Sequence, residues 1–405
     1  MSDTPENAEA LPEPGAAPGQ QTPPSVSDFW GEGAGPGGEP ISFSTTLRTS
    51  DFVVISLVNG LLNIVTLTLY RFWGKTEVRR RVWRGLRVNG EAFEYTGRGL
   101  ELFIGFLLAV IALGLPFLAI VFAVQFMDPA FAALLFPLYF ILFWLFGFGM
   151  FTAFRYMASR TTWRGVRFAL KGSAQTYGWT WLGMQIASGF TLGWIQPVFE
   201  RMLAEQVWSN LRFGDRRFHW NQTRSEKIGL YGPFALGWFG SVIFVILLFV
   251  VPIVIAITLA PDAAVYMEPP QVVEGPVAPA APPPDWAMTM IVYAVFIVLS
   301  PIFALIWAPY QSALLRSIAA GISLDEARFT LKAGSLSLWW LTVSNLAMIF
   351  LSLGILTPLV QARTARWLIR RLGATGNADL DAARQAGSGP RTAEGLADAF
   401  GFSFI

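Results

Sequence analysis

The sequence contains no cysteine and only one histidine, His219, among its 405 residues. The absence of cysteine excludes disulfides, thiolate metal sites and a cysteine nucleophile. A single histidine excludes a metal site built from several imidazoles. The sequence also lacks the motifs of serine hydrolases, zinc proteases and P-loop proteins. We therefore expect a protein that is not an enzyme and that holds no cofactor and no metal.

Charged residues are scarce as well. They make up 14% of the chain, whereas hydrophobic residues make up 54%. A soluble globular protein carries about 25% charged residues, so this chain cannot cover a water-facing surface with charge. Lipid is the other solvent that accepts so much apolar surface, and the composition therefore predicts a membrane protein.

Long uncharged runs support this prediction, because a spanning helix needs about 20 apolar residues. Four runs meet that length: Leu102–Gln125, Phe131–Phe151, Pro233–Ala260 and Trp286–Ala308. Three further runs carry glycine, asparagine or proline in their middle: Phe52–Leu69, Trp181–Phe199 and Trp339–Val360. They either complete a count of seven spans or are re-entrant segments beside four spans.

The distribution of Lys and Arg orients these runs. Short loops on the cytoplasmic side are rich in basic residues. The stretch 71–98 is strongly basic, whereas the Pro-rich loop 261–285 contains acidic residues and no Lys or Arg. Basic residues flank Trp181–Phe199 and Trp339–Val360 on both sides, which favours re-entrant segments. We expect both termini to lie in the cytoplasm.

Basic residues and tryptophans follow each of the three interrupted runs. Such a pattern can bind nucleic acid, but Trp and Arg beside an apolar run also suit the lipid headgroup layer. Because the pattern recurs next to membrane segments, we expect binding to anionic lipid headgroups and not to nucleic acid. The residues expected to anchor the headgroups are Arg71, Trp73, Lys75, Arg79, Arg80, Arg81, Trp83, Arg84, Trp208, Arg212, Arg363, Arg366 and Trp367.

Shared spacings indicate an internal repeat. Phe43, Phe168 and Phe329 each open a short predicted strand, and Thr66, Thr191 and Ser352 stand 23 residues further on. We interpret this as three pseudo-repeats of a strand, a membrane segment, a basic amphipathic helix and a small hairpin. In the first copy, Asn89-Gly90 suits a two-residue hairpin turn. The predicted fold class is a mainly α, polytopic helical membrane protein.

The repeats divide the chain. Residues 1–40 form an acidic tail rich in Pro and Gly that we expect to be disordered. Residues 41–101 hold the first repeat, 102–232 a transmembrane pair with the second, and 233–376 another pair with the third. Residues 377–405 form a polar C-terminal tail.

The first repeat resembles the YjgN family of bacterial inner-membrane proteins, a domain-of-unknown-function group. The resemblance rests on Tyr70-Arg71-Phe72-Trp73, Lys75, the 79–83 cluster, Phe93-Glu94-Tyr95-Thr96-Gly97 and Glu101-Leu102. It extends from about Ile41 to Gly376. It implies a multi-pass inner-membrane protein, and it implies no activity.

Amides within the apolar runs are the remaining candidates for a site. Asn59, Asn63, Gln185 and Asn345 could line a polar path of a transporter or channel where the repeats meet. The alternative is hydrogen bonding between helices in a non-catalytic membrane scaffold or lipid-interacting protein. Glu91, Glu94 and Glu101 are expected to pair with nearby arginines. The partners left open are a small solute and a second copy of the chain.

Overall fold

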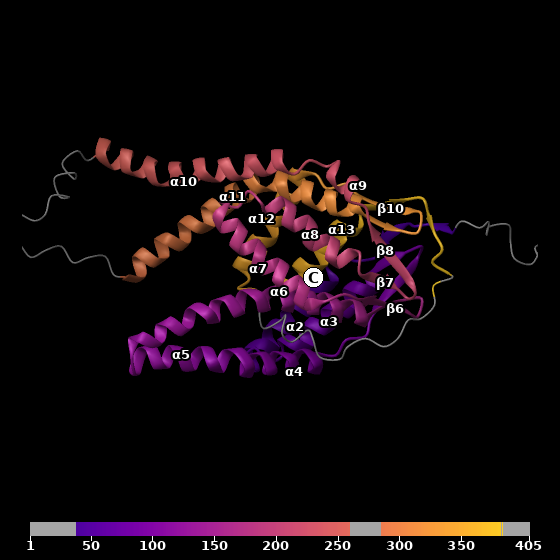
Figure 1. Cartoon of the computed structure of the whole chain (residues 1–405), viewed down its shortest axis with the longest axis horizontal. Coiled ribbons are helices and arrows are strands. Elements are labelled where there is room, and N and C mark those ends of the chain that lie inside the picture. Colours follow the sequence, from indigo (N-terminus) through magenta and orange to yellow (C-terminus); the bar gives the residue numbers. More distant parts are fainter. Residues whose placement is uncertain (1–37, 260–284, 382, 384–405) are drawn as a thin grey trace, which may run out of the picture.

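Four long apolar helices dominate the computed structural model, which describes residues 38–259, 285–381 and 383 (Figure 1). The segments long and apolar enough to cross a membrane are Gly99–Phe126, Ala130–Arg160, Tyr231–Leu248 and Val298–Gly321. All four overlap the four uninterrupted runs of the sequence. The prediction of four runs of membrane-spanning length is therefore confirmed, although the second helix continues nine residues beyond its predicted end at Phe151.

The long helices form two pairs that extend away from the rest of the molecule (Figure 1). The first pair is α4 (Gly99–Ala109), a π-helical stretch (Val110–Gly114), α5 (Leu115–Phe126), a 3-10 helix (Pro129–Leu134) and α6 (Leu135–Arg160). The second pair is α10 (Tyr231–Leu259) and α11 (Asp285–Gly321). The predicted outer loop that joins α10 to α11 lies outside the described residues.

Each interrupted run of the sequence belongs to a helical hairpin. The three hairpins are α2 (Asp51–Val65) with α3 (Arg71–Gly85), α7 (Ala174–Phe190) with α8 (Gln196–Trp208), and α12 (Ser335–Leu351) with α13 (Thr357–Ile369). A 15-residue helix such as α2 is only about 22 Å long, which is short of a hydrocarbon core of about 30 Å. The runs Trp181–Phe199 and Trp339–Val360 each contain a turn, so neither run is a single helix.

The same five-residue turn forms the tip of every hairpin. In the second and third hairpins the N–H of Gly193 and Gly354 donates to the carbonyl five residues earlier, at 2.8 and 2.7 Å. Thr68 makes this bond in the first hairpin, at 2.6 Å. The residue before each of them is a leucine with φ near +50°. These leucines are 70–90% exposed, so the tips present apolar surface: Leu67, Leu192 and Leu353.

The strands form one ten-stranded antiparallel sheet, which the sequence did not predict. Its order follows the chain from β2 to β11 without exception. The strands are β2 (Phe43–Thr45), β3 (Leu86–Val88), β4 (Glu91–Tyr95), β5 (Thr161–Trp163), β6 (Val166–Leu170), β7 (Leu211–Phe213), β8 (Arg216–Trp220), β9 (Ile322–Leu324), β10 (Ala327–Leu331) and β11 (Leu372–Thr375). The small hairpins expected from the sequence are present, for example β3 with β4, but they join into one sheet.

Helical hairpins and pairs of long helices alternate as the connections between strands of this sheet. A helical hairpin joins β2 to β3, a pair of long helices joins β4 to β5, and the second hairpin joins β6 to β7. The pair α10 and α11 then joins β8 to β9, with the short helix α9 (Gln222–Glu226) before it, and the third hairpin joins β10 to β11. Each excursion returns to the neighbouring strand, which makes every pairing antiparallel. The remaining connections are tight turns, including Asn89-Gly90 with φ of 48° and 81°, as predicted.

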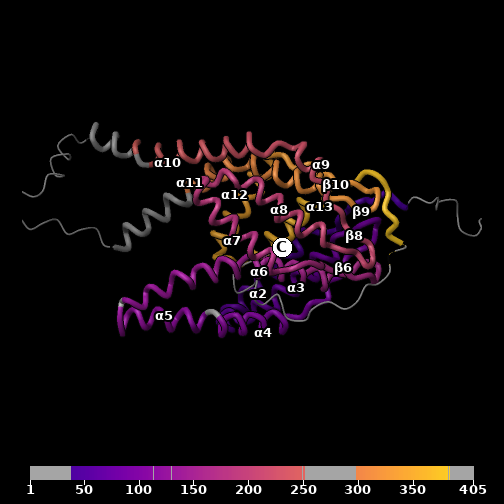
Figure 2. The backbone as a smooth tube through the Cα atoms, viewed as in Figure 1, coloured from indigo at the N-terminus to yellow at the C-terminus, as the bar shows by residue number. Residues whose placement is uncertain are grey.

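The two ends of the sheet approach one another. Strand β1 (Glu39–Pro40) pairs with β12 (Asn377–Ala378), so the start and the end of the described chain meet beside the sheet (Figure 2). The phenyl rings of Phe43 and Phe329 lie 6.1 Å apart. The predicted tail boundaries at residues 40 and 377 coincide with this strand pair.

Phenylalanines from successive strands pack together against the sheet. The ring centroids of Phe93 and Phe168 lie 6.1 Å apart, and those of Phe168 and Phe213 lie 4.9 Å apart. Phe218 continues the series to Phe329 at 6.2 Å. Each such pair contributes about 0.5–1.5 kcal/mol beyond the burial of its area. The sheet is thus a rigid base from which the helices extend.

Candidate functional site

Helix α3 presents two polar faces, because residues three and four apart lie on the same side of a helix. One face carries Tyr70, Trp73, Glu77, Arg80, Arg81 and Arg84. The other carries Arg71, Gly74, Lys75 and Val78. The structure places a separate cavity beside each face, and the two cavities share no residue.

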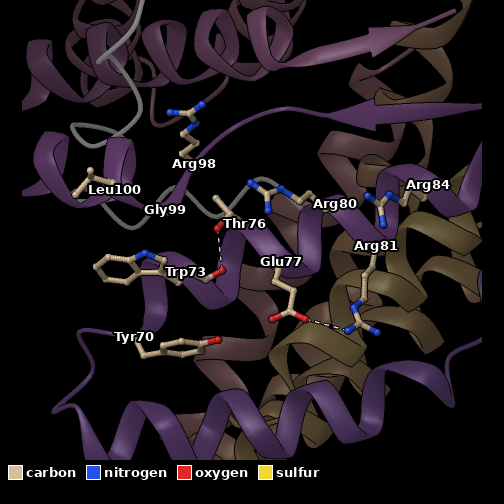
Figure 3. A pocket seen from close by; sticks show the side chains of 10 residues that line it. All are labelled: Tyr70, Trp73, Thr76, Glu77, Arg80, Arg81, Arg84, Arg98, Gly99 and Leu100. Carbon is tan, nitrogen blue, oxygen red and sulfur yellow. Dashed lines mark hydrogen bonds and ion pairs between the residues drawn. The ribbon is translucent and has the colours of Figure 1, made fainter.

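The first cavity, which we name the basic cleft, lies where helix α4 begins. Its volume is about 730 Å³, and Arg98, Gly99 and Leu100 line the side opposite α3 (Figure 3). A Cβ atom added to Gly99 would lie 2.9 Å from the Cα atom of Trp73. Only glycine allows this approach, which brings the first residues of a candidate membrane span against α3.

Arginines dominate the electrostatics of the basic cleft. Four guanidinium groups line it, from Arg80, Arg81, Arg84 and Arg98, against the single carboxylate of Glu77. Arg81 Nη2 lies 2.9 Å from a carboxylate oxygen of Glu77, and both side chains are about half exposed. Arg80 Nη2 donates to the carbonyl oxygen of Gly97 at 2.8 Å, which fixes its direction. The cleft therefore carries a net positive charge and suits an anion.

Aromatic side chains form one end of the cleft. Trp73 is 41% exposed, and Figure 3 shows its ring and that of Tyr70 at the end of the cleft away from Arg81 and Arg84. Indole and phenol rings prefer the boundary between lipid tails and headgroups. The cleft thus combines an apolar edge at the start of a span with guanidinium groups that can bind phosphate oxygens in pairs.

Arg79 is a correction to the predicted headgroup set. Its side chain is only 2% exposed, and Nη1 donates to the hydroxyl oxygen of Tyr95 at 3.3 Å. Its guanidinium carbon also lies 5.8 Å from the centroid of the Tyr95 ring. A basic run with four arginines within six residues cannot place all of them on one side of a helix, so this one faces the protein interior.

Several other predicted anchoring residues bind within the protein. The indole nitrogen of Trp83 donates to Thr161 Oγ1 and that of Trp367 to Ser337 Oγ, each at 2.9 Å. Trp208 packs its ring on Phe218. These three tryptophans join helices to the sheet or to each other.

The predicted basic anchors that follow the second and third interrupted runs also lie against other parts of the protein. Arg212 lies on strand β7, opposite Arg217 of β8. Arg363 donates to Ser344 Oγ at 3.0 Å, across the third hairpin. The Nε atom of Arg366 is buried. Thus Trp73, Arg80, Arg81 and Arg84 are the predicted anchors gathered in the basic cleft, whereas Arg71 and Lys75 line the second cavity.

The predicted polar path is only partly assembled. Asn59 and Asn63 line the second cavity, which we name the tip cavity because the tip of the third hairpin closes it. Asn345 instead donates from Nδ2 to Thr364 Oγ1 at 3.1 Å, within its own hairpin. Gln185 lies half-buried on α7 and lines neither cavity. The structure therefore brings two of the four amides together.

The acids near the first basic cluster have different environments. Glu101 accepts a hydrogen bond from Arg160 Nη2 at 2.8 Å and another from the hydroxyl of Tyr156. This confirms its predicted pairing with arginine. Glu91 and Glu94 are exposed on strand β4. Within the part of the chain that the structure describes, no three His, Asp or Glu side chains lie close enough to hold a metal ion.

Sequence reasoning missed Arg98 as a member of the site. One signal could have revealed Arg98, because basic residues that directly precede a span lie at the same interface as the other headgroup-level cations. Because Arg98 and Arg84 are 14 residues apart in the sequence, the spacing alone does not indicate that both line one cleft.

Four helices of membrane-spanning length, apolar hairpin tips and a basic cleft at the start of a span define a helical membrane protein. The chain belongs to the family described as "Bacterial protein of unknown function (DUF898)", whose profile matches residues 39–399. The resemblance to the YjgN family is thereby confirmed.

Named relatives support this membership. Residues of this chain are 28% identical over 134 positions to "Inner membrane protein YjgN" of Salmonella typhimurium, which covers 33% of this chain and 32% of that protein. The protein of the same name in Escherichia coli K12 is 27% identical over 152 positions, covering 38% and 36%. The chain thus matches only about a third of the length of these curated relatives. No solved structure matches it.

Proposed function

We propose that this chain is a non-catalytic, multi-pass inner-membrane protein that binds anionic lipid headgroups in the basic cleft. The observation that carries the proposal is the grouping of Arg80, Arg81, Arg84 and Arg98 around a cleft at the first residue of a span. A phospholipid beside α4 would have its headgroup at this height. Each basic residue near an anionic membrane surface contributes roughly 1 kcal/mol.

The proposed topology has four spans and three re-entrant or interfacial hairpins, with both termini in the cytoplasm. Supporting observations are the short length of α2 and the exposed leucines at the three tips. The recurrence of one tip turn and one following helix also supports the proposal that the three segments are copies of a common unit. Apolar tips and basic flanks would keep each hairpin on the cytoplasmic face of the bilayer.

Cysteine labelling tests this topology, because the chain contains no native cysteine. Single cysteines at Ser173 and Gln222 flank the second hairpin on either side. We expect both to react with a membrane-impermeant maleimide only after the cytoplasmic face is exposed. Labelling of the two positions from opposite sides would disprove the re-entrant arrangement.

A transport path is the second candidate function, and its support is narrower. The tip cavity contains Asn59 and Asn63, as a path would require. However, neither cavity includes Gln185 or Asn345. The geometry therefore favours lipid binding over a channel along the four amides.

Lipid binding can be measured on the full chain in nanodiscs by native mass spectrometry, which counts bound lipids. We expect phosphatidylglycerol to be retained in preference to phosphatidylcholine, and the preference to weaken with salt. Replacing Arg80, Arg81 and Arg84 together by glutamine should weaken retention roughly a hundredfold, at about 1 kcal/mol for each charge.

The matched control is Arg217→Gln, which removes an exposed cation on strand β8 instead. This variant should retain phosphatidylglycerol as the unaltered chain does. Equal retention of the two lipids, or a triple variant that binds like the control, would contradict headgroup binding in the cleft.

A further inference from the structure

The tip cavity is a second site, on the face of α3 opposite the basic cleft. Its volume is about 320 Å³, within the usual range for small ligands. Helices α2 and α3 form its walls, and residues 354–361 of the third hairpin close it. A Cβ atom at Gly60 would lie 2.7 Å from Cγ2 of Ile355, so glycine is what lets the third hairpin approach α2.

The amide oxygens of two residues that line this cavity are buried without a hydrogen-bond partner. Asn59 is only 6% exposed, and its Oδ1 atom accepts no hydrogen bond. Oδ1 of Asn63, one helical turn further along α2, is also buried without a partner. A buried acceptor left unpaired costs about 1–3 kcal/mol. Such a cost is explained if a ligand with N–H groups completes the hydrogen bonds.

The same cavity is positively charged. Arg71 and Lys75 line it, and no carboxylate occurs among its described lining residues. Helix α13 begins at Thr357 on the cavity wall, and its N-cap residue Leu356 offers no side-chain hydrogen bond. The N–H of Thr357 donates to the carbonyl oxygen of Gly354 at 3.1 Å, and Pro358 has no N–H, so Arg71 and Lys75 are the groups here that can hold an oxyanion. The cavity thus provides for an oxyanion and for hydrogen-bond donors at once.

Its position relative to the span limits the ligand further. Trp73, which lies between Arg71 and Lys75 on α3, contacts Gly99 at the start of the first span. The guanidinium carbon of Arg71 lies 4.6 Å from the ring centroid of Phe106 in that span. The cavity therefore lies beside the first turns of the first candidate span, where a lipid headgroup could reach it.

We propose that the tip cavity binds a phosphoethanolamine group. Arg71 and Lys75 would hold the phosphate oxygens, and the amide oxygens of Asn59 and Asn63 would accept hydrogen bonds from the primary ammonium. The group can come from the headgroup of phosphatidylethanolamine or from a free solute. This proposal does not depend on anion binding in the basic cleft, since the two sites share no residue.

The test uses the full chain and two probes. Equilibrium binding of radiolabelled O-phosphoethanolamine to detergent-solubilised protein measures the free solute. Native mass spectrometry from nanodiscs compares phosphatidylethanolamine with phosphatidylcholine, whose trimethylammonium has no N–H. Binding of the soluble compound without preference between the lipids assigns a free solute, and a preference for phosphatidylethanolamine assigns a lipid.

Variants locate the binding. Lys75→Gln should weaken binding tenfold or more, because it removes a charged partner of the phosphate, and Asn63→Ala should weaken it about threefold to tenfold. Arg217→Gln, which removes an exposed cation on strand β8 and lies in neither cavity, is the matched control and should leave phosphoethanolamine binding unchanged. A far-ultraviolet circular dichroism spectrum and a melting temperature equal to those of the unaltered chain would show that each variant folds.

Three results would overturn the proposal. The first is no measurable binding of either probe. The second is equal retention of phosphatidylcholine and phosphatidylethanolamine together with no binding of the soluble compound. The third is binding that Lys75→Gln and Asn63→Ala leave unchanged in folded protein. A failure of the basic cleft would instead appear as loss of the phosphatidylglycerol preference, with phosphoethanolamine binding intact.

Discussion

The first and second helical hairpins share a tip turn, but the polar residues that follow the turn have different surroundings. Lys75 stands nine residues after Thr66 in the first hairpin, and Glu200 stands nine residues after Thr191 in the second. The side chain of Lys75 lines the tip cavity. The carboxylate of Glu200 is instead enclosed by the protein.

The carboxylate of Glu200 in the second hairpin has hydrogen-bond partners from within the fold. Glu200 accepts a hydrogen bond from Gln196 Nε2 at 2.8 Å and another from the hydroxyl of Tyr310 on α11. At the equivalent position of the first hairpin, Lys75 lines a cavity. The same backbone turn therefore serves packing in one hairpin and leaves a binding site in the other.

The largest expected effect concerns the enclosed group. Glu200→Ala removes the acceptor of both Gln196 and the fully buried Tyr310. We expect the free energy of unfolding to fall by about 2–3 kcal/mol, because the buried hydroxyl of Tyr310 and the half-buried amide of Gln196 lose their acceptor. Lys75→Ala, at the equivalent position of the first hairpin, should cost less than about 1 kcal/mol. Denaturation in detergent micelles, followed by tryptophan fluorescence, measures both, and equal losses would refute the contrast.

The glycine of the second tip and the threonine of the first tip can be exchanged by mutation. Gly193 has φ of +84°, whereas the first hairpin holds Thr68 at φ of +70°, a conformation that β-branched residues rarely adopt. Gly193→Thr should lower the free energy of unfolding by about 1–3 kcal/mol. Thr68→Gly should raise it by up to about 1 kcal/mol, since the strain is relieved. If both substitutions destabilise the protein, the tips are not equivalent.

The pH dependence of stability should distinguish the two hairpins as well. Burial raises the pKa of Glu200, and its hydrogen bonds to Tyr310 and Gln196 oppose this rise. The stabilisation from the protonated carboxyl is complete below the unfolded value of about 4.3 and is lost as the pH rises through the raised pKa. Glu200→Gln should therefore gain stability relative to the unaltered chain across that interval. Parallel stability curves from pH 4 to pH 8 would contradict this.

The smallest expected effect concerns the surface pair of the basic cleft. The side chains of Arg81 and Glu77 are 50% and 42% exposed. Such pairs stabilise a helix by only about 0.3–0.5 kcal/mol. Arg81→Ala should therefore change the unfolding midpoint very little, while lipid retention still responds to its charge. A loss above about 1 kcal/mol would show that the pair has a structural role instead.

Much of the helical architecture could be predicted from the sequence. Runs without charge identify the long helices, and Asn89-Gly90 identifies a hairpin, because both signals are local. The tips were harder, since glycine and asparagine within an apolar run mark an interruption without giving its geometry. The sheet was not predicted, because strands of three to five residues carry little pattern, and partners such as β4 and β5 are separated by a pair of long helices.

Only part of the candidate site was predictable for the same reason. The basic run of α3 is evident in the sequence, but its division into two faces depends on what packs against each side. The burial of Arg79 beside Tyr95 and the approach of Arg98 to Arg84 result from the return of the chain through strand β4. No spacing rule along the chain contains that information.

By itself the sequence determined that this is a membrane protein with four long apolar helices and basic, tryptophan-bearing segments beside the interrupted runs. Hydrophobicity and charge are sums over neighbouring residues, so they can be read along the chain. The tertiary structure decided that the strands join into one sheet, that Arg98 completes the basic cleft, and that Ile355 closes a cavity over Asn59. These contacts join residues up to about 300 positions apart, and only the packing of the hairpins around the sheet brings them together.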